Sequence, residues 1–339
     1  MTQWKRFSLT LLSWFYRAAV HTRHFLYDRK VLLPQLAPLP VVSIGNIMAG
    51  GTGKTQATLI LAEELSQTLR VAILSRGYRG GSEKAKKPLV VCTKKHSAAL
   101  CGDEPWLLAS RLSSSLVIVN KNRFKSAVEA HHLGAQVILL DDGMQHRRLH
   151  RNVEIVVIDG QTPFGAFLPK GQRREEVGRL KNADLILFVG YPDERMKQTV
   201  NTLTSAPQIT ARIQAEGIFH LDGSPLESIK GREVALFCGI GNPSRFVKTV
   251  EGLGATIVAA HFSSDHTLLG EKALQKFATL AKKRGAELLV CTEKDKVKLA
   301  HSNFFMPIVW VRTRLEIEEN REAWDTMISN IKLLARTGS

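Results

Sequence analysis

The sequence predicts an α/β fold: a mostly parallel sheet with helices on both faces, followed by a smaller C-terminal α/β domain joined to it by a two-stranded β ribbon. One reason is that short β-branched runs alternate with helical patterns in the first part of the chain. Another is that this alternation restarts after a polar interval beyond Tyr191. The strands expected in the first part are Val41–Gly45, Val71–Ser75, Leu89–Thr93, Leu116–Val119, Val137–Asp141, Glu154–Asp159 and Leu185–Val189.

Helical segments separate these strands. The expected helices include Thr55–Leu69, Glu104–Arg111 and Arg123–Leu133. In open parallel sheets, ligands bind at the carboxyl ends of the strands. Polar or glycine-containing segments follow the first, second and fifth strands, at residues 46–55, 75–79 and 141–142. We therefore expect a ligand site at this edge of the sheet.

The second part of the chain is predicted to begin with a β ribbon. Its two strands are Gln208–Gln214 and Gly217–Leu221, with a turn near Ala215 and Glu216. A second α/β unit follows, with strands near Val234–Cys238, Thr256–Ala259, Glu287–Cys291 and Ile308–Val311, a helix at Ser244–Leu253, and a final helix at about Ile317–Leu334. The predicted units are an N-terminal helix (1–30), a core (31–205), a ribbon linker (206–228), a smaller α/β domain (229–315) and a C-terminal helix that packs back on the core (316–339).

A glycine-rich loop lies between the first strand and the first helix. It ends in Gly50-Gly51-Thr52-Gly53-Lys54-Thr55. Glycines let backbone N–H groups turn toward phosphate oxygens, the lysine reaches the outer phosphates, and the threonine hydroxyl can hold Mg²⁺. Met48 stands where the usual P-loop pattern G-x-x-x-x-G-K-[ST] has its first glycine. The strand before it and the helix after it nevertheless predict a P-loop nucleotide site, and hence a core of the P-loop NTPase type.

Two adjacent carboxylates end the fifth strand. Asp141 and Asp142 follow a wholly apolar run, Val137–Leu140. A phosphate loop needs an acidic partner that holds Mg²⁺ or its waters beside the β- and γ-phosphates. Thr55, Asp141 and Asp142 are therefore the predicted metal site, and the sequence leaves open which aspartate binds the ion directly.

The composition is that of an ordinary globular protein with a large excess of positive charge. Lys and Arg number 47 against 31 Asp and Glu, for a formal net charge of +16. Such an excess implies a polyanionic partner: nucleic acid, an anionic membrane surface or a phosphorylated substrate. Aromatic residues make up 7% of the chain and no nucleic-acid-binding motif occurs, so we expect no nucleic-acid partner. The four cysteines lie far apart, which predicts a reduced protein without structural zinc or disulfides.

The N-terminal segment combines aromatic and basic residues. Lys5 and Arg6 precede an apolar stretch, Phe7–Val20, and further basic residues follow it. This stretch is too short and too interrupted for the roughly 20 residues of a spanning helix. Its pattern fits a helix lying in the interface of an anionic membrane. A terminal helix docked on the protein's own core is the other interpretation.

Several motifs resemble one family, the tetraacyldisaccharide 4′-kinases, which phosphorylate the lipid A disaccharide. Residues 141–146 read D-D-G-M-Q-H, similar to that family's D-D-G-x-Q-H segment. The loop with Met48 also fits, because the family's loop reads G-N-x-x-x-G-G-T-G-K-T. Further similar segments, in the family's order, are residues 74–80, 102–105, 168–171, 239–246, 262–266 and 292–295. The likeness covers most of the chain, with minor departures at Thr267 and in a rather short N-terminal segment.

The resemblance implies a reaction and the residues that carry it. ATP, with Mg²⁺, would phosphorylate the 4′-hydroxyl of an acylated glucosamine disaccharide 1-phosphate and give the 1,4′-bisphosphate. It implies a peripheral or monotopic protein at the cytoplasmic face of the Gram-negative inner membrane, and no obligate protein partner is inferred. Asp103 would take the hydroxyl proton with support from His266, while Lys54 holds the phosphates. From the residues alone, the simpler interpretation of Asp103 is a helix N-cap and that of His266 a surface loop histidine, so both roles depend on the resemblance.

Other side chains are candidates for binding the acceptor. The expected set is Arg76, Tyr78, Arg79, Glu104, Arg123, His146 and Arg179. His146 either touches the metal-side network or is satisfied within its turn, and Asp295 is expected to cap a turn or helix, with a nucleotide contact also possible. Without the resemblance, a P-loop regulatory ATPase or GTPase, or a nucleic-acid-binding ATPase, shares the loop and the acidic strand.

Overall fold

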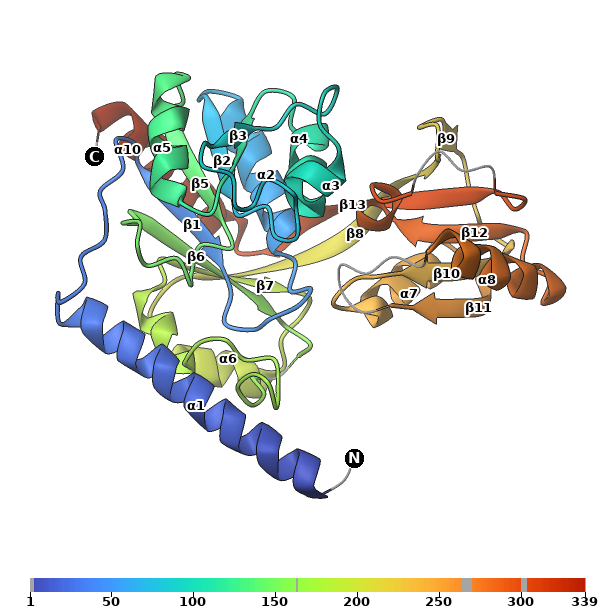
Figure 1. The fold of residues 1–339 in the computed structure, drawn as a ribbon, viewed down its shortest axis with the longest axis horizontal. Helices are drawn as coiled ribbons and strands as arrows, with labels where there is room; N and C mark the ends of the chain where they lie inside the picture. The colour runs from blue at the N-terminus through green and yellow to red at the C-terminus, as the bar shows by residue number, and fades with distance from the viewer. Residues whose placement is uncertain (1–2, 163, 264–269, 300–303, 339) are drawn as a thin grey trace.

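The computed structural model describes residues 3–162, 164–263, 270–299 and 304–338, which form two α/β bodies joined by a long ribbon (Figure 1). The strands of the larger body are β1 (Val41–Gly45), β2 (Val71–Ser75), β3 (Leu89–Val90), β4 (Leu116–Val119), β5 (Val137–Asp141), β6 (Val153–Asp159) and β7 (Leu185–Val189). They lie in the order β7-β6-β1-β5-β2-β4-β3. Only the β3–β4 pair among them is antiparallel. The predicted mostly parallel sheet is thus confirmed.

Continuous apolar sequence explains the interior strands. Every residue of β1, β2, β5 and β7 is buried, as expected for parallel strands covered on both faces. The predicted strand Leu89–Thr93 is only partly right, because β3 ends at Val90 on the sheet edge. There the amides of Lys95 and His96 donate to the Cys92 carbonyl at 3.0 and 2.8 Å, so local turn bonds replace the ladder.

Helices cover both faces of this sheet. On one face, α2 (Lys54–Ser66), α4 (Asp103–Arg111) and α10 (Arg321–Thr337) share an apolar cluster with β1 and β6 that includes Leu61, Leu108 and Trp324. The opposite face is covered by α5 (Arg123–His132), by α6 (Glu194–Asn201) and by the 3₁₀ helix η1 (Val177–Asn182). A short helix, α3 (Ala98–Cys101), precedes α4. The three helices predicted in this part are confirmed, with ends shifted by a few residues.

The ribbon is built differently from the prediction. β8 (Gln208–His220) is one continuous strand, so the predicted turn at Ala215 and Glu216 is wrong. Its partner is β13 (Ile308–Glu319), which pairs with it antiparallel along almost its whole length. Near Gly217 the register shifts by a bulge and the strand continues. The pairing is non-local, and a local turn pattern therefore could not reveal it.

The same ribbon corrects the last predicted helix. Residues 317–319 belong to β13, and α10 begins only after Asn320, whose φ is 59°. β8 also pairs parallel with β7, so the ribbon continues the sheet of the larger body into the smaller one. A short strand, β9 (Pro225–Leu226), pairs with the far end of β8.

The smaller body is a second, mostly parallel α/β unit. Its strands are β10 (Glu233–Cys238), β11 (Thr256–Phe262) and β12 (Leu288–Thr292), and its helices are α7 (Pro243–Gly252), α8 (Glu271–Lys283) and α9 (Glu293–Lys296). β12 pairs with β13, which links this unit to the ribbon. Apolar clusters lie on both of its faces, one centred on Phe237 and Phe277 and the other on Leu236 and Phe246.

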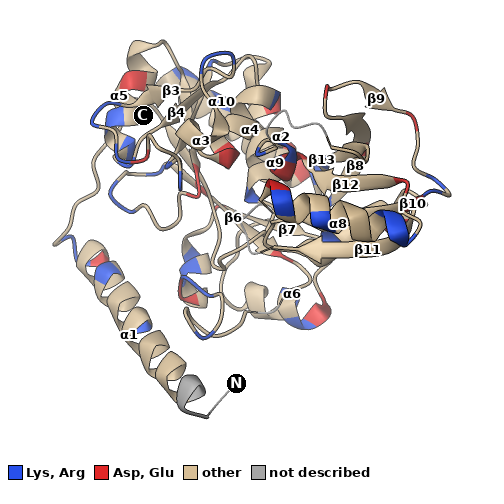
Figure 2. Ribbon diagram, turned by 45° about the vertical axis from the view of Figure 1, so that its right-hand side comes forward, with Lys and Arg blue, Asp and Glu red and all other residues tan. Residues whose placement is uncertain are grey.

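The N-terminal helix α1 (Gln3–Asp28) is a long rod along the outside of the larger body (Figures 1 and 2). Residues 7–16 of α1 carry no charged side chain, and charged residues follow at positions 17, 23 and 28 (Figure 2). Across the part of the chain that is described, no helix is both long and apolar enough to cross a bilayer.

Candidate active site

The loop between β1 and α2 has the backbone geometry of a phosphate cradle. Gly50 and Gly53 have φ of 100° and 97°, a left-handed region that favours glycine. A Cβ on Gly53 would lie 2.9 Å from Val189 of β7. The Asn46 amide donates a hydrogen bond to the Thr52 hydroxyl at 2.8 Å and closes the loop. Because α2 begins at Lys54, the loop amides stand at a helix N-terminus, which favours an anion.

The residues before Gly50 pair with a distant segment, and this explains Met48. Met48 is buried and forms an antiparallel bridge with Arg173. The Ala49 amide donates to the Gln172 carbonyl at 2.6 Å, and the Arg174 amide donates to the Ile47 carbonyl at 2.7 Å. Position 48 needs no glycine because its backbone is extended and paired, and the turn falls at Gly50 instead.

The two carboxylates at the end of β5 lie in different surroundings. Asp141 is buried and accepts a hydrogen bond from the Ser75 hydroxyl at 3.1 Å. Burial, followed by Glu104 and the adjacent Asp142, raises the pKa of Asp141. Asp142 has a φ of 52°, unusual for a residue with a side chain. Such backbone strain is common at functional sites.

Asp142 is held by two cations. Lys54 Nζ lies 3.5 Å from its Oδ1, and Arg174 binds both of its oxygens, at 2.7 and 2.9 Å. Burial alone would raise the pKa of Asp142, but Lys54 and Arg174 lower it well below its usual range. Asp142 is therefore an ionised carboxylate beside the loop lysine.

Glycine contacts bring two further motif loops together. A Cβ on Gly80 would lie 2.6 Å from the Gly102 amide nitrogen, and one on Gly77 would lie 2.8 Å from the Cys101 carbonyl. The loop that carries Tyr78 and Arg79 therefore packs directly on the start of α4. α4 begins at Asp103 with Gly102 in the N-cap position, so the N-cap interpretation of Asp103 is wrong.

A large basic cavity opens in front of these elements. Its volume is about 1390 Å³, and it is bounded by Lys54, Asp141 and Asp142 at one end and by α1 at another. Six of the seven side chains predicted to bind the acceptor line it: Arg76, Tyr78, Arg79, Glu104, Arg123 and His146. The seventh, Arg179, does not, because it binds Asp28 of α1 at 2.9 Å. Asp103 directly precedes the lining residue Glu104 but is not itself part of the lining, and His266 falls outside the described residues.

The most buried cation of the cavity is Arg123, at 4% exposed. Burial lowers the pKa of its guanidinium to about 10, although Asp141 and Asp142 act against this. Its Nη1 donates only a long bond, 3.3 Å, to the Asn120 carbonyl. Burial, with Arg123 and Arg148 next, lowers the pKa of His146 to about 4, so its imidazole is neutral near pH 7. The cavity thus presents Arg123 to an incoming anion.

The smaller body touches the glycine-rich loop directly. A Cβ on Gly241 would lie 2.1 Å from the Gly51 amide nitrogen, so the turn after β10 covers the loop. Asp159, at the end of β6, holds this turn: Asn242 Nδ2 donates to it at 3.1 Å and Arg245 pairs with it at 2.9 Å. Gly241 is explained by this close approach to the loop.

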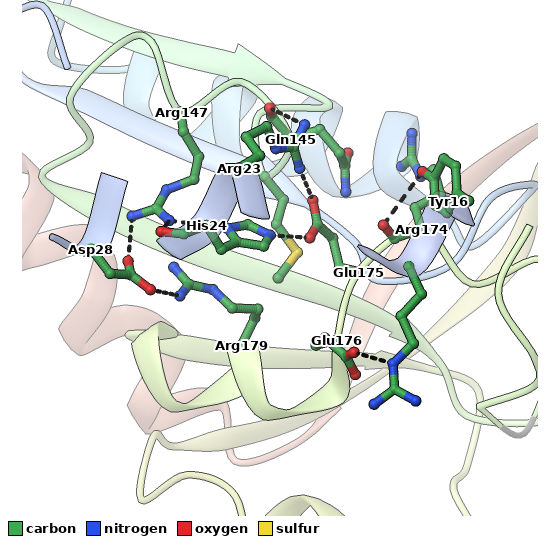
Figure 3. Close-up of polar contacts among 12 residues, drawn as sticks. Tyr16, Arg23, His24, Asp28, Gln145, Arg147, Arg174, Glu175, Glu176 and Arg179 are labelled. Atoms are coloured by element: carbon green, nitrogen blue, oxygen red, sulfur yellow. Dashed lines mark hydrogen bonds and ion pairs between the residues drawn. The ribbon is translucent and has the colours of Figure 1, made fainter. Parts of the chain in front are cut away.

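Helix α1 is anchored to the same site mainly through residues 174–179, with a further contact from Arg147 (Figure 3). The buried Glu175 binds Arg23 at 2.8 Å and His24 at 2.5 Å. Asp28 pairs with Arg147 at 2.9 Å, as it does with Arg179. The neighbouring Arg174 holds Asp142, and the segment therefore connects α1 with the acidic pair.

Some of these residues were missed from the sequence. Arg174, Glu175 and Lys298 each make buried ionic contacts at the site. Arg174 and Glu175 lie inside the basic stretch after Leu168-Pro169-Lys170-Gly171. Their position directly after that motif was the only sequence feature that could have indicated them. Lys298 follows the motif at residues 292–295, but nothing local indicates that it faces Asp103.

A glycine-rich loop at a helix N-terminus, a paired acidic strand end and a basic cavity define an α/β phosphotransferase that uses a nucleotide. Comparison with known proteins agrees with this class. The family model described as tetraacyldisaccharide-1-P 4′-kinase (LpxK) matches residues 5–332. The chain belongs to this family and is a kinase of it.

Individual relatives and a solved structure support the assignment. A tetraacyldisaccharide 4′-kinase of Chlamydia caviae is 35% identical over 95% of this chain and 89% of its own. Another, of an Anaeromyxobacter species, is 39% identical over 84% of this chain and 79% of its own. The crystal structure of LpxK from Aquifex aeolicus in complex with ATP matches with a TM-score of 0.74, at 28% identity over 96% of this chain and 99% of that one.

Proposed function

We propose that this kinase transfers the γ-phosphoryl group of ATP to the 4′-hydroxyl of an acylated glucosamine disaccharide 1-phosphate, giving the 1,4′-bisphosphate of a lipid A precursor. The observation that best supports this proposal is a single cavity. It is lined by Lys54, Asp141 and Asp142 and also by residues of the N-terminal segment, namely Tyr16, Arg23, Tyr27 and Leu32. A lipid whose sugar enters this cavity has its acyl chains beside α1. The family match over nearly the whole chain supports the same acceptor.

The loop and Lys54 act on the nucleotide. Phosphoryl transfer passes through a loose transition state, so positioning and charge neutralisation dominate catalysis. In this P-loop arrangement the amides of residues 50–55 bind the phosphates and Lys54 reaches the outer ones. Lys54 is held in reach by Asp142, which fixes its position before the nucleotide arrives.

The residues at the acidic strand end fit Mg²⁺. Thr55 offers a hydroxyl, and Asp141 and Asp142 offer carboxylates, the hard oxygen donors that Mg²⁺ prefers. Within the described ranges, no group of three or more His, Cys, Asp or Glu could hold a metal alone. In nucleotide sites Mg²⁺ is bound by one or two carboxylates and completed by phosphates and water. When bound, it neutralises charge that develops on the phosphates.

Asp103 is the proposed base. It begins α4 beside the loop of Tyr78 and Arg79, next to Glu104, which lines the cavity. An aspartate is a weak base, but a strong base is not required when proton transfer is late in a loose transition state. The supporting role of His266 rests on the family resemblance alone.

Arg123 is the proposed contact for an acceptor phosphate, with Arg76 and Arg79 nearer the mouth. Arg76 is already paired with Glu83 at 2.7 Å, and Arg79 adopts a φ of 61° beside Tyr78. A buried guanidinium binds phosphate through two parallel hydrogen bonds in a site that excludes water. The 1-phosphate of the acceptor is the anion that the proposed reaction supplies.

Transfer of label tests the reaction. Purified full-length protein, γ-labelled ATP, Mg²⁺ and the acylated disaccharide 1-phosphate in detergent should give labelled lipid. EDTA should abolish the label, and the 1,4′-bisphosphate should accept none because its acceptor oxygen is occupied. ATP hydrolysis without labelled lipid would contradict the proposal, and stimulation of that hydrolysis by single-stranded nucleic acid would favour the nucleic-acid ATPase instead.

We further infer that α1 docks on an anionic membrane, at the cytoplasmic face of the Gram-negative inner membrane. One side of α1 is held on the core by Ser13, which donates to the Phe167 carbonyl at 2.7 Å, and by His24. The other side leaves large apolar side chains exposed: Phe7, Leu11, Leu12, Trp14, Phe15 and Phe25, followed by Val31, Leu32, Leu33 and Leu36. An aromatic apolar face on a chain of net charge +16 fits an interfacial helix.

A variant that combines Leu11→Ser, Trp14→Ser and Phe15→Ser should therefore bind vesicles containing anionic lipid at least about tenfold more weakly. The reason is that three apolar side chains no longer enter the membrane interface. Sedimentation with vesicles of defined anionic content measures it. The matched control carries Leu280→Ser and Leu333→Ser, two exposed leucines on α8 and α10. Equal binding of both variants and the parent protein would refute the docking face.

A further inference from the structure

A lysine of the smaller body lies beside the proposed base of the larger one. Lys298 Nζ is 3.3 Å from Asp103 Oδ2 and 3.6 Å from Asp295 Oδ1. The side chains of Lys298 and Asp103 are 11% and 18% exposed, and that of Asp295 is fully buried. One ammonium group is therefore enclosed between two carboxylates that belong to different bodies.

Asp295 also holds the turn that covers the glycine-rich loop. Its Oδ1 accepts a hydrogen bond from the Gly239 amide at 3.0 Å, and Gly239 begins the turn whose Gly241 touches Gly51. The Thr292 hydroxyl donates to the other oxygen of Asp295 at 2.6 Å. The Asp295 carboxylate thus ties the position of Lys298 to the position of the loop cover.

A second contact repeats this arrangement at the next residue of α4. Lys294 Nζ lies 3.0 Å from Glu104 Oε1, so the smaller body supplies one lysine to each of the two acidic residues that begin α4. Farther from the cavity, Arg111 of α4 binds Glu293 at 3.1 Å. α9 and the residues just after it are therefore the part of the smaller body that contacts the start of α4.

We propose that Lys298 is a positioning residue for phosphoryl transfer, which orients the Asp103 carboxylate toward the acceptor hydroxyl when the smaller body is seated on the glycine-rich loop. The proposal rests on the proposed role of Asp103 as base. An ammonium group near 3 Å favours the anionic carboxylate and restricts its rotation. Since Asp295 links Lys298 to the loop cover, the base is assembled in the same closure that encloses the phosphates.

Stability alone does not account for a lysine at this place. Taking an ammonium group and two carboxylates out of water costs free energy that their attraction offsets only with good geometry. Apolar residues of similar size often replace buried ion pairs without loss of stability. The positive charge of Lys298, between the two bodies and beside the proposed base, is better explained by its effect on the orientation of the Asp103 carboxylate.

The test compares Lys298→Met, Lys298→Gln and Lys298→Arg with Lys296→Met, whose lysine ends α9 two residues earlier and lies over the Trp310 ring. For Lys298→Met and Lys298→Gln we expect kcat for lipid phosphorylation to fall at least about tenfold, with the KM for ATP within about twofold, because orientation and not nucleotide binding is lost. Lys298→Arg should recover part of kcat, and Lys296→Met should match the parent protein. Parent-like kcat in both neutral variants overturns the proposal.

A double variant separates this role from a structural one. If Lys298 acts through Asp103, adding Lys298→Met to Asp103→Asn should change kcat by less than about twofold. The full loss seen in the single variant, repeated in the Asp103→Asn background, would overturn the proposal. Failure of the base assignment looks different: Asp103→Asn alone then keeps parent-like kcat.

Discussion

Lys54→Met should lower kcat for lipid phosphorylation by about 10³-fold, the scale of a lost transition-state charge partner in phosphoryl transfer. Lys54 lies at the N-terminus of α2, in line with the cradle, and Asp142 holds its ammonium group at 3.5 Å. Methionine keeps the length and most of the packing but removes the charge. The KM for ATP should rise much less than kcat falls, since the loop amides remain. Initial rates with labelled ATP over a range of concentrations measure both.

The control for this variant is Lys276→Met, which removes the same charge from an exposed position on α8. It should match the parent protein. Lys54→Arg keeps the charge with a different shape, and it should remain well below the parent because a planar guanidinium does not fit a site shaped for a point charge. A Lys54→Met enzyme that keeps a tenth or more of the parent kcat would contradict the assignment.

The sequence was sufficient where local pattern decides structure. β1, β2, β4, β5 and β7 have the predicted bounds, because each is a short apolar run ended by a polar or glycine residue. The carboxyl edge of the sheet was also predictable as a meeting point. Lys54 and Thr55 begin the helix that follows β1, Asp141 and Asp142 end β5, and β1 and β5 are neighbours in the sheet. Pattern alone therefore predicted that Lys54, Asp141 and Asp142 lie together, and they line one cavity.

Long-range contacts were not predictable in this way. The ribbon pairs β8 with β13 across most of the smaller body, and neither strand carries a local signal for the other. The N-terminal segment has two alternative interpretations from sequence, and in the structure α1 is docked along one side and exposed along the other. Arg174 and Lys298 meet Asp142 and Asp103 only after distant segments fold together.

Asp103→Asn should reduce kcat by about 10²- to 10³-fold, within the usual contribution of a general base. The amide has nearly the same shape, so α4 should still begin at this position and the loop of Tyr78 and Arg79 should still pack on it. It cannot take a proton, and it presents Lys298 with a neutral partner. Nucleotide affinity should stay within about twofold, because Asp103 does not line the pocket formed by the glycine-rich loop.

Two comparisons make this result specific. Asp222→Asn makes the same chemical change on an exposed turn of the smaller body and should keep the parent kcat. Asp103→Glu restores a carboxylate but moves it by one methylene, and it should recover only a fraction of kcat since the oxygen must lie within hydrogen-bond reach of the hydroxyl. If Asp103→Asn instead bound ATP poorly at unchanged kcat, Asp103 would act on the nucleotide. The base would then have to be another acidic side chain of the cavity. Glu104, the next residue of α4, lines the cavity and is the first candidate.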